Sequence, residues 1–181
     1  MSEWTAFQSQ IRVSSPFFDH TQKDERAART INWDSIKEGT FTHRILKVGE
    51  HFVQGEVALQ KEDWETAIWH LKKAIAVEDT LRYTEPPYWL QPVRHTLGAV
   101  YMKTGQHQLA AQVYQEDLRI WKDNGWSLFG LSQALKAMEK LDESKSILTK
   151  LDEVWKNADE PHPETSCKCI KDLKSSTLKQ D

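Results

Sequence analysis

Two cysteines near the C-terminus are the residues best suited to chemistry. Cys167 and Cys169 stand two positions apart, and His162 precedes them. Two thiolates and one imidazole are ligands that Zn²⁺ and Cu⁺ accept, but structural zinc usually takes four ligands, so we expect an incidental tail with no metal and no other cofactor. Cysteines this close cannot join distant elements through a disulfide, which favours a reducing compartment.

Other catalytic patterns are missing from the sequence. It contains no Gly-rich phosphate loop followed by Lys and Ser or Thr, no His-Glu-x-x-His and no Gly-x-Ser-x-Gly. His43 and His51 are eight residues apart and can share a helix face, but a lone histidine on a helix is typical of packed or solvated positions. We therefore expect that the protein has no catalytic residue and is not an enzyme.

Composition narrows the classes of partner. Charged residues make up 28% of the 181 residues and the net charge is -3, so no positive field indicates binding to nucleic acid. No stretch approaches the roughly 20 apolar residues of a membrane span. The first residues lack the basic start and apolar run of a signal peptide. We expect a cytoplasmic protein that binds neither nucleic acid nor membrane.

Small residues recur at fixed spacing and indicate the elements that position any site. Of three similar stretches, residues 55–67, 98–110 and 132–144, the first two begin with glycine and end with alanine, and the third begins and ends with serine. Gly98 follows Gly55 by 43 residues, and Ser132 follows Gly98 by 34. A period of 34 residues is typical of helix-turn-helix repeats that bury their apolar faces against their neighbours.

The residues of these stretches resemble the tetratricopeptide repeat (TPR). The likeness lies in Gly55-Glu56-Val57-Ala58-Leu59 with Trp64 and Ala67, and in Leu97-Gly98-Ala99-Val100-Tyr101 with Gly105 and Ala110. The third copy departs most, since Ser132, Glu139 and Ser144 replace the usual small residues. The resemblance implies an all-α fold of three helix-turn-helix units in a right-handed superhelix, preceded by a capping helix.

The expected layout has three parts. An irregular arm and a capping helix (about 22–37) fill residues 1–41, the TPR-like domain fills 42–159, and a disordered tail fills 160–181. Within the domain, repeats are expected at about 48–81, 91–124 and 125–158, with an insertion at 82–90. We predict one helix from about Tyr88 to Lys103 and another from about Gly125 to Met138. Gly105 is expected in a left-handed turn, and Asp142 is expected to be an N-cap.

In TPR proteins the first helices of the repeats line a concave groove, and partners contact set positions in each repeat. Carried to this chain, the resemblance implies a mostly apolar and aromatic groove that binds another protein or peptide. The Lys and Asn residues of the chaperone-binding carboxylate clamp are replaced here. The groove positions that we select are Phe52, Glu56, His95, Met102, Trp126, Phe129, Gln133 and Lys136.

The occupant of this groove is left open by the sequence. An external apolar segment or helix can enter it, or the chain's own Pro16-Phe17-Phe18 can fold into it. Two further functions remain as alternatives: small-ligand sensing, or a role as the regulatory subunit of a larger complex. Self-association through an exposed terminal repeat, giving a homo-oligomer, is a third.

A narrower resemblance covers residues 83–94 and 123–131. These segments look like the C-terminal part of longer bacterial and fungal TPR proteins of poorly defined function. The first segment overlaps the insertion, and two interpretations of it stay open. Either its aromatic residues fill a gap between repeats while an acid pairs with an arginine, or the segment forms a rim of the groove with that arginine as an anion-binding fork. The residues concerned are Glu85, Tyr88, Trp89 and Arg94.

Overall fold

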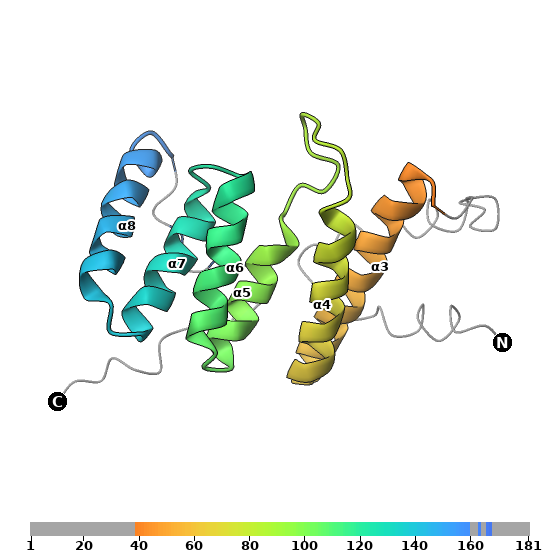
Figure 1. Ribbon diagram of the computed structural model, residues 1–181, viewed down its shortest axis with the longest axis horizontal. Helices are drawn as coiled ribbons and strands as arrows, with labels where there is room; N and C mark the ends of the chain where they lie inside the picture. The colour runs from red at the N-terminus through yellow and green to blue at the C-terminus, as the bar shows by residue number, and fades with distance from the viewer. Residues whose placement is uncertain (1–38, 160–162, 164–165, 168–181) are drawn as a thin grey trace. The chain divides into compact units, whose positions relative to one another are not determined.

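The computed structural model describes residues 39–159, 163, 166 and 167. These residues form six α-helices and contain no strand (Figure 1). The chain divides into an N-terminal unit, Met1–Tyr88, and a C-terminal unit, Trp89–Asp181, and each is described by itself. The arm with Pro16-Phe17-Phe18 and the expected capping helix lie outside the described residues.

The N-terminal unit is a hairpin of two helices, α3 (Phe41–Gln60) and α4 (Trp64–Glu78). A side-chain oxygen caps the N-terminus of each helix. Thr40 Oγ1 accepts a hydrogen bond from the His43 backbone N–H, and Asp63 Oδ1 accepts one from the Thr66 backbone N–H. The helices approach closely at Gly55, where an added Cβ would lie 3.1 Å from the Leu71 side chain. A small residue is therefore needed there, as the repeat pattern predicts.

The C-terminal unit contains two more hairpins, α5 (Val93–Lys103) with α6 (His107–Ile120) and α7 (Gly125–Ala137) with α8 (Leu141–Trp155). Helix α6 packs against α7, and α5 also contacts α7. The fully buried Tyr114 of α6 lies between Gly98 of α5 and Gly130 of α7. A Cβ on either glycine would stand 2.4 Å from Tyr114 Cζ, so both positions must stay small.

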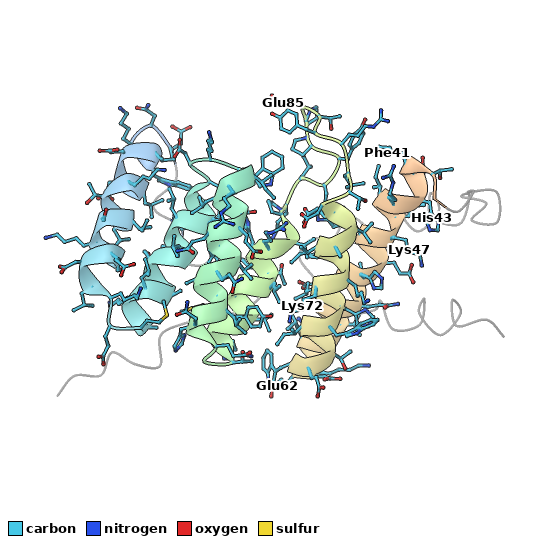
Figure 2. The ribbon with its side chains drawn as sticks, in the orientation of Figure 1. Phe41, His43, Lys47, Glu62, Lys72 and Glu85 are labelled. Carbon is cyan, nitrogen blue, oxygen red and sulfur yellow. The ribbon has the colours of Figure 1, made fainter. Side chains whose placement is uncertain are left out.

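Each of the three hairpins has one turn between its two helices, and the three turns share one backbone conformation. Glu62, Gly105 and Glu139 adopt positive φ angles of 56°, 72° and 62°. Figure 2 shows Glu62 at the end of the N-terminal hairpin. The left-handed turn predicted at Gly105 is confirmed, and the two glutamates adopt the same conformation at the cost that a Cβ imposes.

Two helix starts differ from the sequence-based expectation. Helix α5 begins at Val93 rather than near Tyr88, because Pro92 is its N-cap and a proline disfavours helical angles at the residue before it, here Gln91. Helix α8 has Lys140 as N-cap, so the prediction of Asp142 was wrong. Asp142 lies in the first turn instead, where its negative charge interacts favourably with the helix dipole.

Candidate functional site

A cavity of about 290 Å³ lies where α5 and α7 begin. Its walls come from three places: the loop and first turn leading into α5, the start of α7, and two residues that follow α8 by about ten positions. The lining residues are Leu90, Gln91, Pro92, His95, Asn124, Trp126, Ser166 and Cys167. The two segments of the narrower resemblance, 83–94 and 123–131, therefore meet at one cavity.

The C-terminal wall of the cavity consists of Ser166 and Cys167, which are only 5% and 1% exposed. Ser166 Oγ forms a hydrogen bond with the hydroxyl of Tyr114 on α6. Cys167 is disulfide-bonded, so the hydrogen bond of 3.4 Å between Thr96 Oγ1 and Cys167 Sγ has the hydroxyl as donor. Two residues of the segment 160–181 thus pack against α5 and α6.

The disulfide also changes the view of Cys167 as a metal ligand. A disulfide sulfur carries no thiolate charge, and Cys167 faces a hydroxyl and, at 3.9 Å, Gln91 Nε2. Across the described ranges, no group of three or more His, Cys, Asp or Glu side chains is placed to hold a metal ion. Cys169 and His162 fall outside these ranges.

Behind the cavity lies a buried polar cluster from α5, α6 and the start of α7. The fully buried Asp117 accepts a hydrogen bond of 2.6 Å from Ser127 Oγ, and its Oδ2 lies 3.2 Å from His95 Nε2. Asn124 Nδ2 lies 3.2 Å from the same imidazole nitrogen. Asp117 therefore fixes the imidazole that lines the cavity. Because Ser127 donates to the carboxylate and not to His95, the cluster lacks the order of a Ser-His-Asp nucleophile.

Trp126 forms the aromatic wall of the cavity and remains 41% exposed. Its ring meets that of Trp155 edge to face, with centroids 5.1 Å apart. Trp155 in turn lies so close to Gly125 that a Cβ there would be 2.2 Å from its Cζ3. Asn124 caps α7, since its Oδ1 accepts from the Trp126 backbone N–H at 3.1 Å. This cap and the second ring hold Trp126 in place at the mouth of the cavity.

The groove positions selected from the sequence fall into three sets. His95 and Trp126 line the cavity, whereas four others lie further along α5 and α7 and are not among its lining residues: Met102, Phe129, Gln133 and Lys136. Phe52 and Glu56 lie on α3 in the N-terminal unit. Burial raises the pKa of Glu56 to about 7.

The residues selected as a loop rim find partners of their own. Glu85 accepts a hydrogen bond from the hydroxyl of Tyr83, and Figure 2 shows Glu85 at the tip of the loop after α4. The Tyr88 ring meets that of Phe41, with centroids 4.5 Å apart. In the C-terminal unit, Trp89 is partly buried.

Arg94 is buried within its own hairpin. It is only 7% exposed, and its Nε lies 3.9 Å from Glu116 Oε2 on α6. Glu116, on the second helix of the hairpin that α5 begins, is thus an acidic partner of Arg94.

Comparisons with known proteins bear on the fold. No family model matches the chain, and no curated protein matches it. The chain is similar to MamA, known from a crystal structure, with a TM-score of 0.53 and 18% sequence identity. The match covers 67% of this chain and 64% of the MamA chain. The fold is a TPR-like helical repeat. The likeness at this identity shows the fold alone.

No helix in the described part of the chain is both long and apolar enough to cross a bilayer.

Proposed function

We propose that the protein is a non-enzymatic interaction scaffold whose C-terminal unit binds an extended peptide segment at the cavity between the starts of α5 and α7. The observation that carries this proposal is that Ser166 and Cys167, which are not helical, already line this cavity. Their side chains meet Tyr114 and Thr96. The surface is thus compatible with polypeptide, and a partner segment competes with the chain's own.

The chemistry of the walls indicates what the partner segment contains. Trp126 and Pro92 supply apolar surface at the mouth, which suits an aliphatic or aromatic side chain. Deeper in, the imidazole of His95 and the amide of Asn124 supply polar groups held in place by the buried cluster. A small residue suits the position next to Tyr114, where Ser166 lies. We therefore expect an extended segment with a small residue close to a large apolar one.

The groove is proposed to continue along the faces of the first helices. Met102 on α5 and Phe129, Gln133 and Lys136 on α7 lie beyond the cavity in the same unit. Met102 and Phe129 are partly exposed, so they can add apolar contact area for a longer peptide or a helix.

A panel of short synthetic peptides tests the proposal. The full chain is screened by fluorescence anisotropy, and the dissociation constant of the best binder is measured again with Trp126→Ala. We expect the affinity to fall roughly tenfold or more, as for an aromatic residue at the centre of an interface. Trp69→Ala is the matched control, because Trp69 is 52% exposed in the N-terminal unit. Circular dichroism verifies that helix content is unchanged.

Two results would overturn the proposal. One is that no peptide of the panel binds the full chain, and the other is that Trp126→Ala binds as well as the unmodified protein. A peptide that enters the cavity also displaces the residues that line it. Hydrogen exchange at the Ser166 and Cys167 amides is therefore expected to speed up in the complex.

The volume of the cavity favours a second candidate, a small ligand. About 290 Å³ is close to the lower end of the range for small-molecule sites, and the cavity combines apolar walls with a few polar groups. A thermal-shift screen of metabolites distinguishes the two. A compound that raises the unfolding temperature of the full chain but not of His95→Ala supports ligand sensing.

A further inference from the structure

Two histidines from different helices face each other in the N-terminal unit. His51 lies on α3 and His70 on α4, and their Nδ1 atoms are 3.2 Å apart. The ring centroids are 5.5 Å apart and the ring planes are inclined by 42°. Both side chains are partly exposed, so the pair can be reached from solvent. His43 and His51 both lie on α3, as the sequence suggested, but the contact of His51 described here is with His70 on the other helix.

The separation of these nitrogens matches that of two ligands on one metal ion. Imidazole nitrogen binds Zn²⁺ at about 2.0–2.1 Å, and two such bonds to atoms 3.2 Å apart enclose an angle of about 100°. This angle lies between the octahedral and the tetrahedral values. Without a metal, the contact needs one Nδ1 with a hydrogen and one without.

We propose that His51 and His70 bind one divalent transition-metal ion through their Nδ1 atoms and so link α3 to α4. Imidazole suits Zn²⁺, Ni²⁺ and Cu²⁺. Two protein ligands leave the remaining coordination positions to water or to a group from a partner. This inference does not depend on the proposed peptide site, since it concerns the other unit.

The neighbouring charged groups set the strength of such a site. Glu50 adjoins His51 in sequence but forms an ion pair of 2.7 Å with Lys47, so its carboxylate is already engaged. Lys73 lies over the ring of Trp69, which meets both imidazoles edge to face. One carboxylate and two ammonium groups around the pair do not favour a cation electrostatically. Affinity must therefore come from the two imidazole nitrogens themselves.

Protonation competes with the metal at both nitrogens. Burial lowers the pKa of His51 and of His70 below the usual value for histidine. Neutral imidazole is the form that binds metal, so both side chains are ready to bind at neutral pH. Acid is expected to release the ion.

Calorimetric titration of the full chain with ZnCl₂ at neutral pH tests the site. We expect the unmodified protein to bind one Zn²⁺ ion. In both His51→Gln and His70→Gln, the affinity for Zn²⁺ is expected to fall roughly tenfold or more. His43→Gln is the matched control, because His43 also lies on α3 but is not part of the pair. Thermal unfolding with and without Zn²⁺ gives a second readout, since an ion that binds only the folded state raises the midpoint.

The outcomes separate clearly. Loss of binding and of thermal stabilisation in the two glutamine variants, but not in the His43 variant, supports the site. Zinc binding that is equal in all four proteins places the ion elsewhere and overturns the inference. Absence of zinc binding by the unmodified protein overturns it as well.

Discussion

Glu56 carries a largely buried carboxyl group whose pKa is raised by burial. It lies on α3, and within the described residues its Oε1 is buried without a hydrogen bond. Burial raises the pKa of this carboxyl group from 4.5 to about 7. Glu56→Gln removes the charge and keeps the shape, so it isolates the cost of ionising this group in the folded protein.

The magnitude follows from linkage. The difference between 4.5 and about 7 corresponds to about 3 kcal/mol, at about 1.4 kcal/mol per pKa unit. Because the pKa is raised on folding, the folded protein binds the proton more tightly than the unfolded chain does. The contribution of Glu56 to the free energy of unfolding is therefore most favourable below pH 4.5 and becomes less favourable as the pH rises towards 7. Above that pH, the glutamine variant is expected to be more stable by up to about 3 kcal/mol.

Urea unfolding of both proteins across this pH range measures the effect. The stability difference between Glu56→Gln and the unmodified protein is expected to grow with pH and to level off near neutrality. Glu50→Gln serves as control, since Glu50 lies on the same helix, is partly exposed and forms an ion pair with Lys47. A stability difference for Glu56→Gln that is the same at low and high pH would refute the reasoning from burial.

Three further predictions follow from the turns, the close packing and the histidines. Glu139→Gly relieves a φ of 62° and is expected to raise the free energy of unfolding by about 1 kcal/mol, measured by urea titration. Gly98→Ala places a Cβ 2.4 Å from Tyr114 Cζ and is expected to lower it by roughly 1 to 3 kcal/mol; an unchanged unfolding midpoint would contradict this. The pKa values of His51 and His70 are lowered on folding, so the unfolded chain binds more protons and stability falls as the pH drops below 6.5. In thermal scans this acid-induced loss is expected to be smaller for His70→Gln.

The helix pairs could be predicted because the information is local. Gly55 and Gly98 stand at equivalent positions of two repeats, and their closeness to Leu71 and Tyr114 explains why these positions favour small residues. The predicted start of α5 near Tyr88 was wrong because Pro92 disfavours helical angles at the residue before it, and the helix begins only after this proline.

The candidate site could be predicted only in part. His95 and Trp126 were found from repeat positions, but the cavity also needs contacts between residues far apart in the sequence. Tyr114 and Ser166 are separated by 52 residues, and His95 and Asp117 by 22. Such pairings depend on tertiary packing, which periodicity does not report.

Tyr114 contributes both to the stacking of the helices and to the docking of Ser166 beside the cavity. Its ring separates Gly98 from Gly130 within the stacked helices, and its hydroxyl contacts Ser166 beside the cavity. Shifts in helix packing therefore move the hydroxyl that Ser166 meets. The free energies of stacking and of C-terminal docking are then coupled, so mutations on the two sides of this ring are expected to be non-additive. Substitutions at buried positions around Tyr114 can thus change how often Ser166 leaves the cavity, and hence how accessible the cavity is to a partner.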